Sequence, residues 1–184
     1  MKRNILLLTL FFLLLTPIFA QSDVFSINIT INYIEISLEY ISGGNYIAWW
    51  ISDLVPGDTA ITDFDELVKV INRSNISVDI LCSAWDAPDS TTIDSLWPIW
   101  TISEDAGIDT FALLWASYNT PPVSPNFADA QSVFETPIRI ENNITSGEER
   151  YFNGWFIAPI EGYAGERHRL QTRFTAVPSV IPGY

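Results

Sequence analysis

Apolar and polar residues alternate with a period of two along most of this chain, and no stretch sustains the period of an amphipathic helix. Successive side chains of a strand point to opposite faces, so this alternation predicts strands with one buried face. Turn-forming runs such as "SGGN" at 42–45 and "VPGD" at 55–58 separate the apolar segments. The pattern therefore predicts an all-β fold.

About nine such segments are expected to form strands. They lie at residues 25–40, 46–51, 65–72, 76–84, 97–103, 107–118, 135–140, 149–159 and 166–177. Many short strands with frequent turns, and no helices, favour two packed sheets. We expect an immunoglobulin-like or jelly-roll-type sandwich, formed by a single domain over residues 21–184.

The first 20 residues are typical of a secretory signal peptide. Lys2 and Arg3 precede an apolar run, and Pro17 and the small residue Ala20 follow it. The alternative is a membrane anchor, but the apolar run is short for a span of roughly 20 residues. The sequence therefore predicts a secreted or cell-surface protein with no membrane span after cleavage.

Acidic residues far outnumber basic ones, 22 against 9, for a formal net charge of −13. Two of the basic residues lie in the expected signal peptide, so the mature chain is still more acidic. Such a surface repels nucleic acid, so no nucleic-acid partner is expected.

The composition offers little for catalysis. The only histidine, His168, lies at the edge of an expected strand, and no G-x-S-x-G motif accompanies it. The only cysteine, Cys82, alternates onto one face with Ile76, Val78, Ile80 and Ala84. A cysteine on such a face behaves as a small buried apolar residue. We predict no enzymatic activity, and one cysteine excludes an internal disulfide.

Metal binding has one weak candidate. One cysteine and one histidine leave too few ligands for a structural zinc site. Calcium prefers carboxylate oxygens, and these gather in the segment 58–66 without the spacing of a helix–loop–helix calcium loop. The calcium candidates are Asp58, Asp63, Asp65 and Glu66. Otherwise no cofactor is expected.

The alternation in residues 25–40 changes phase halfway. Up to residue 33 one face carries the apolar residues Phe25, Ile27, Ile29, Ile31 and Tyr33, and afterwards the apolar set is Ile34, Ile36, Leu38 and Tyr40. A one-residue slip turns every side chain to the other face. The phase change predicts a bulge near Tyr33–Ile34, or two halves that pair with different sheets or different molecules.

The last expected strand carries a basic stripe. Arg167, Arg169 and Arg173 fall on one face, with Gln171 between them. Two readings are open: pairing with glutamates of this chain across the sheet, or contact with the acidic surface of another copy.

Surface chemistry is suggested by two further patterns. Four sequons would permit N-glycans in a secreted chain, at Asn28, Asn72, Asn75 and Asn143. Seven tryptophans could pack in the core or an interface, or could stack on sugar rings; packing is the favoured reading.

Three segments carry a resemblance to known proteins. "VINRSNISVDI" at 70–80, "NITSGEERYFNGWFIAP" at 143–159 and "RLQTRFTAVP" at 169–178 resemble immunoglobulin-like sandwich domains of microbial cell-surface proteins. More loosely, the chain is similar to the TasA/camelysin group of secreted sandwiches, which build extracellular matrix fibres. The resemblance implies a surface or matrix role and supplies no active-site residues.

These observations together predict a secreted structural protein that self-associates into a filament or a surface layer. Residues 21–33 could act as a donor strand that adds to a neighbouring copy. The alternative is an ordinary first strand within the chain's own domain. The alternative function is a carbohydrate-binding module or adhesin that uses exposed tryptophans.

Overall fold

The computed structural model describes residues 33–52, 54–86, 100–161 and 168–179, which belong to one compact unit running from Asn32 to Tyr184. Strands dominate these residues, as expected for an all-β fold. Their helical content is limited to two short 3-10 turns, η1 (Phe64–Glu66) and η3 (Phe127–Asp129). No helix of the described ranges is long and apolar enough to cross a membrane.

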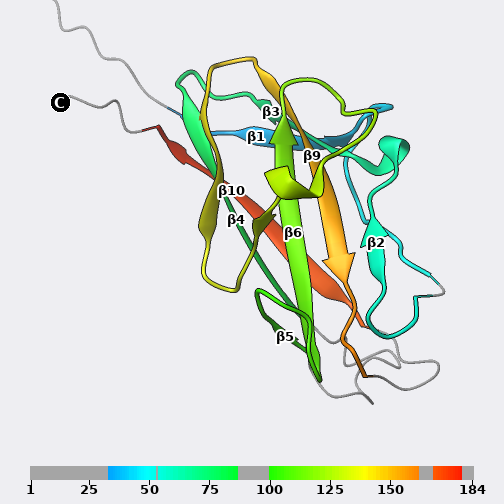
Figure 1. The fold of residues 1–184 in the computed structure, drawn as a ribbon. Helices are drawn as coiled ribbons and strands as arrows, with labels where there is room; N and C mark the ends of the chain where they lie inside the picture. The colour runs from blue at the N-terminus through cyan, green and yellow to red at the C-terminus, as the bar shows by residue number, and fades with distance from the viewer. Residues whose placement is uncertain (1–32, 53, 87–99, 162–167, 180–184) are drawn as a thin grey trace, which may run out of the picture. The chain divides into compact units, whose positions relative to one another are not determined.

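Two sheets pack face to face (Figure 1). The larger sheet has the order β1 (Ile36–Tyr40), β3 (Val68–Asn72), β9 (Glu149–Ile157), β6 (Thr110–Tyr118) and β5 (Thr101–Ile102). Two short strands join it, β2 (Thr59–Ile61) beside β9 and β7 (Gln131–Ser132) beside β6. The smaller sheet has the order β10 (Leu170–Pro178), β4 (Val78–Asp86) and β8 (Ile138–Ile144). All pairings are antiparallel except that of β5 with β6.

The core between the sheets follows the predicted alternation. On β4 the inward residues Val78, Ile80, Cys82 and Ala84 have no exposed surface. They belong to one apolar cluster with aromatic residues of the larger sheet, Phe111, Trp115, Phe152 and Phe156. Burying a large apolar side chain completely stabilises a fold by about 1.5–3 kcal/mol, so the cluster accounts for why the two sheets associate. The predicted two-sheet sandwich is confirmed.

The expected strand at residues 46–51 is wrong. The Tyr40 hydroxyl accepts hydrogen bonds from the amides of Ile47 (3.3 Å) and Ala48 (3.2 Å) and donates one to the Ala48 carbonyl (3.0 Å). A side chain thus satisfies the main chain that would otherwise pair with a strand. Trp49 turns inward, with its ring 6.4 Å from that of Trp115, while Trp50 is 83% exposed.

The strands named above number ten rather than the expected nine. The additional elements, β2 and β7, have three and two residues. Strands this short leave no alternation to detect, because they pair over only two or three positions.

The second phase of residues 25–40 forms β1, with Ile36 and Leu38 packed against the core. Just before it, the chain is held to the turn after β3. The Arg73 amide donates to the Glu35 carbonyl (2.9 Å), and the Glu35 amide donates to Ser74 Oγ (2.8 Å). The first phase, apart from the exposed Tyr33, lies outside the described residues.

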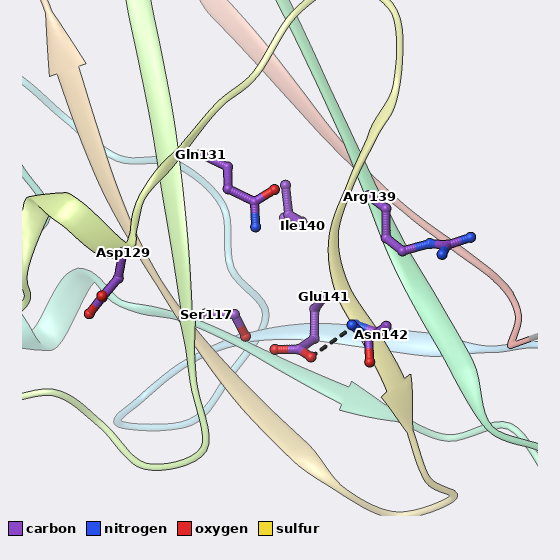
Figure 2. A pocket seen from close by; sticks show the side chains of 7 residues that line it. All are labelled: Ser117, Asp129, Gln131, Arg139, Ile140, Glu141 and Asn142. Atoms are coloured by element: carbon purple, nitrogen blue, oxygen red, sulfur yellow. Dashed lines mark hydrogen bonds between the residues drawn. The ribbon is translucent and has the colours of Figure 1, made fainter.

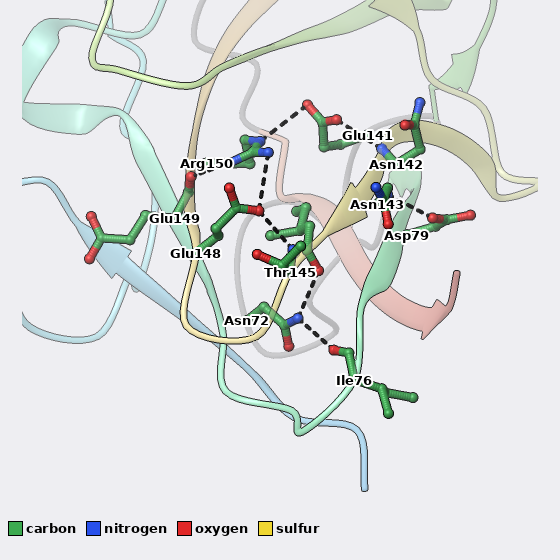
Figure 3. Close-up of polar contacts among 11 residues, drawn as sticks. Asn72, Ile76, Asp79, Glu141, Asn142, Asn143, Thr145, Glu148, Glu149 and Arg150 are labelled. Atoms are coloured by element: carbon green, nitrogen blue, oxygen red, sulfur yellow. Dashed lines mark hydrogen bonds and ion pairs between the residues drawn. The ribbon is translucent and has the colours of Figure 1, made fainter. Parts of the chain in front are cut away.

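A buried asparagine joins the two sheets at one end of the sandwich (Figure 3). Asn72 Nδ2 donates to the carbonyls of Ile76 and Ile144, both at 2.9 Å. Its Oδ1 accepts from the Ser74 amide at 2.8 Å. Asn72 ends β3, Ile76 precedes β4 and Ile144 ends β8, so this one side chain satisfies the main chain where strands of both sheets meet.

Candidate functional site

Among the described strands, β10 is an edge of the smaller sheet and pairs with β4 alone. Along its other side, the described residues supply no hydrogen-bonded neighbour. The open main-chain groups of such an edge are a template for an added strand. We call this side of Leu170–Pro178 the open edge.

The open edge is also incompletely covered on its inner face. Phe174 and Ala176 lie opposite Cys82 and Ile80 in the strand register, so the pairs share the core face. Cys82 and Ile80 have no exposed surface, whereas Phe174, Ala176 and Leu170 are only half-buried. Strand β4 covers one side of β10, and no described strand covers the other side. The half-exposure of these three inward side chains is consistent with that missing neighbour.

Aromatic packing connects the open edge to the middle of the core. The Phe174 ring lies edge-on to Trp115 (5.4 Å) and Phe152 (5.3 Å). Gly154 makes room for this packing, because a Cβ there would lie 2.9 Å from the Trp115 ring and 3.2 Å from that of Trp49. A side chain that covered Phe174 would therefore lie next to Trp115 and Phe152 in the core.

The outer face of β10 bears the predicted basic stripe. Arg169, Gln171 and Arg173 are exposed, as expected from the alternation, and Arg167 lies outside the described residues. The Arg173 guanidinium sits over the Trp85 ring at 5.1 Å from its centroid. This cation–π contact holds one positive charge beside the open edge.

The predicted donor residues Phe25, Ile27, Ile29 and Ile31 lie outside the described residues. Tyr33 is 51% exposed, and its amide donates to Asn75 Oδ1 at 3.0 Å. Whether residues 21–33 pair within the chain or with another copy stays a prediction.

His168 forms a buried side-chain contact with Asp86 that the sequence did not predict. Its Nδ1 is 2.8 Å from Asp86 Oδ2, and the two side chains are 5% and 1% exposed. The Trp100 ring stacks on the imidazole at 3.5 Å, and the Trp100 amide donates to Asp86 Oδ2 at 2.8 Å. This contact ties the end of β4 to the residues just before β10.

Cys82 lies in the core, as its alternation predicted. It is a free thiol with no exposed surface. Burial raises the pKa of the thiol to about 12. Because the thiolate is the nucleophile, Cys82 is inert at neutral pH.

The four calcium candidates are not brought together into a site. Asp58 Oδ2 accepts from the Val55 amide (3.4 Å), and Glu66 Oε2 accepts from the Asp63 amide (3.2 Å). The Asp58 carboxylate thus holds the turn at 55–58, the Glu66 carboxylate holds the start of η1, and Asp65 is exposed. Within the described ranges, no group of three or more His, Cys, Asp or Glu side chains could hold a metal ion.

The sequons differ in accessibility. Asn72 has no exposed surface and its amide nitrogen makes two hydrogen bonds, so a glycan on Asn72 is incompatible with this fold. Its expected role as a glycan acceptor is corrected to a structural one. Asn75 and Asn143 are exposed, and their glycosylation stays a prediction. Asn28 lies outside the described residues.

The tryptophans mostly pack. Trp115 and Trp155 are buried at 4% and 2% exposure, and Trp49, Trp85 and Trp100 are half-buried. Trp50 alone among the described tryptophans is exposed. Trp97 lies outside the described residues.

The fold and the open edge define the class of this protein as an all-β, two-sheet sandwich. No family model matches the chain. No curated protein matches it, and no solved structure does.

Proposed function

We propose that this chain is a secreted structural subunit that assembles into an extracellular filament or surface layer by strand addition at β10. The observation that supports the proposal is the open edge, where a half-exposed part of the core meets main chain that no described strand pairs with. The chain also offers a matching strand, since residues 25–33 alternate strictly between apolar and polar side chains.

The proposed contact has two energetic parts. An added strand forms main-chain hydrogen bonds along β10, each contributing about 0.5–1.5 kcal/mol net. Its apolar face would cover the inward residues of β10, while the polar side chains of Ser26, Asn28 and Thr30 would face solvent. Burying isoleucines adds about 1.5–3 kcal/mol for each that is completely covered. Together these terms suit a stable contact that repeats from subunit to subunit.

The experiment compares the full chain with one that lacks residues 21–33. We expect the full chain to form polymers visible by electron microscopy and the shortened chain to stay monomeric with its melting transition retained. A synthetic peptide of residues 21–33 should then bind the shortened chain with a stoichiometry of one. A shortened chain that polymerises as the full chain does would contradict the proposal.

Two matched double variants test which face of residues 25–33 contacts β10. Ile27→Asn together with Ile29→Asn removes two apolar contacts and should weaken assembly strongly. Asn28→Ala together with Thr30→Ala changes the opposite face and should leave assembly intact. Equal effects of the two pairs would exclude the proposed orientation.

The alternative function, sugar binding through exposed tryptophans, is supported by one exposed side chain among the described tryptophans, Trp50. Trp50 is 83% exposed, whereas two of the other five described tryptophans are buried and three are half-buried. Glycan binding that disappears in Trp50→Ala would favour this second function.

A further inference from the structure

The described chain begins at the end of the sandwich where β10 stops (Figure 1). The Tyr33 amide donates to Asn75 Oδ1 at 3.0 Å, and the amide of Ser179, just after β10, donates to the Ser77 carbonyl at 3.0 Å. Asn75 and Ser77 both lie in the turn between β3 and β4. We call this end of the sandwich the turn end, and the opposite end, where β10 begins at Leu170, the far end.

Hydrogen bonds fix residues 33–35 to the turn. The Glu35 amide donates to Ser74 Oγ at 2.8 Å, and Ser74 Oγ donates to the Glu35 carbonyl at 3.1 Å. The Arg73 amide donates to the same carbonyl at 2.9 Å. Strand β1 then starts opposite Asn72 and runs from the turn end towards the far end. The base of the predicted donor strand is thus held in a set direction.

The donor has little room to change that direction. Asn32 is the one residue between the fixed Tyr33 and Ile31, the last inward residue of the donor before it. Even the tightest reversal between two strands takes a connection of two residues. A donor strand that follows this base therefore reaches a copy lying beyond the turn end.

The other described edge of the smaller sheet, β8, suits a donor less well. Its inward residues Ile140 and Ile144 are buried, whereas the apolar inward residues of β10 are half-buried. A polar pocket lies beside β8 (Figure 2), and its lining includes Ser117, Gln131 and Glu141. The edge that offers a donor uncovered apolar surface is therefore β10.

Filament geometry then sets the orientation of the donor. Copies that repeat head to tail all point the same way, so a copy beyond the turn end presents its far end. The donor enters there and its own N-terminus points to the turn end of the acceptor, whereas β10 runs from the far end to the turn end. We propose, on the basis of the proposed strand addition, that each donor runs antiparallel to β10 of the next copy and joins the copies head to tail.

The opposite orientation leads to a different assembly. A parallel donor requires the acceptor to present its turn end, so that two copies meet through the same ends. Each copy then takes the strand of the other, which closes a dimer and leaves no edge for growth. The antiparallel orientation also continues the pattern of the smaller sheet, where β10, β4 and β8 all pair antiparallel.

Cross-linking of assembled chains tests the orientation. Antiparallel pairing places Ser26 near Val177 and Asn32 near Gln171 of the next copy, and parallel pairing exchanges these partners. The two β10 positions are about 20 Å apart along the strand, so a short bis-maleimide distinguishes the two arrangements. The chain's own cysteine, Cys82, has no exposed surface and does not compete.

Four double variants are compared, with melting curves showing that each one folds. Ser26→Cys with Val177→Cys, and Asn32→Cys with Gln171→Cys, should give a ladder of covalent multimers on a denaturing gel. Ser26→Cys with Gln171→Cys, and Asn32→Cys with Val177→Cys, should remain single chains. Links from the second two variants, or from none of the four, would overturn the inference. Parallel links would leave strand addition itself standing, whereas polymers that form without residues 21–33 would contradict the proposed function.

The head-to-tail arrangement also sets the spacing of copies. Strand β10 has nine residues and is about 30 Å long. We expect electron microscopy of the filaments to show one copy for each axial repeat of about 30–40 Å. Closed dimers in place of filaments would contradict the antiparallel orientation.

Discussion

At the scale of single residues, Asn72 shows how one polar side chain can determine local structure. Its side-chain amide makes three hydrogen bonds to main-chain groups. Its main-chain carbonyl accepts a fourth from the Gly147 amide at 2.8 Å. The three partners of the side chain are the carbonyls of Ile76 and Ile144 and the amide of Ser74. Without the side chain these groups would lose a partner in buried or half-buried surroundings, at a cost of about 1–3 kcal/mol for each one left unsatisfied.

Replacing this side chain should therefore destabilise the protein severely. We expect Asn72→Ala to lower the free energy of unfolding by about 3 kcal/mol or more, measured by denaturant titration followed by tryptophan fluorescence. Asn142→Ala is the matched control, because Asn142 is exposed and should change stability by less than about 0.5 kcal/mol. Equal losses in both variants would contradict the assigned role.

At the scale of elements, Asp79 joins the strands of the smaller sheet (Figure 3). Its Oδ1 accepts from the Asn143 amide of β8 (2.9 Å) and from Ser179 Oγ just beyond β10 (2.6 Å). Its Oδ2 pairs with Arg139 Nε at 3.1 Å. Burial by itself would raise the pKa of this carboxyl, but the hydrogen bonds and the arginine outweigh burial and lower the pKa.

The lowered pKa of Asp79 predicts a pH dependence of stability. A carboxyl whose pKa is lower in the folded state stabilises the fold above its unfolded pKa of about 3.9 and loses that contribution as the pH falls through the folded pKa. We expect Asp79→Asn to be less stable than the parent at pH 7, with the difference shrinking below about pH 4. Melting curves across pH 2–7 would measure it, and Asp65→Asn, at an exposed position, is the control. A difference that is constant with pH would refute the role of the charge.

At the scale of the whole molecule, charge distribution should influence association. The chain has a net charge of −13, yet Arg169 and Arg173 are both exposed on the outer face of β10, beside the open edge. A positive stripe on an acidic molecule is attracted to the acidic surface of another copy, and salt screens that attraction over about 10 Å at 0.1 M.

Assembly should accordingly respond to salt and to the stripe. We expect assembly, followed by light scattering, to slow as sodium chloride rises from about 0.05 to 0.5 M, where screening becomes strong. Arg169→Gln together with Arg173→Gln should reduce that dependence, with Arg73→Gln, which removes an exposed arginine paired with Glu39 at 2.9 Å, as the matched control. Assembly that is indifferent to salt would count against contact through charges.

Much of the fold could be predicted because the alternation records which face of each strand is buried. Cys82 is an example: its position relative to Ile80 and Ala84 is enough to place it in the core. The strand expected at residues 46–51 was wrong because the Tyr40 hydroxyl, six residues before the segment, takes its main-chain hydrogen bonds. Local pattern carries no information about such a partner.

The sequence by itself determined that the chain forms strands with one apolar face, that its thiol is inert and that its surface is acidic. The tertiary structure alone decided that β10 has one neighbour among the described strands, that Asn72 is a structural joint rather than a glycan acceptor, and that Asp86 meets His168. The physical reason is that alternation is a property of neighbouring residues, whereas edges, buried polar contacts and pockets depend on which distant strands pair.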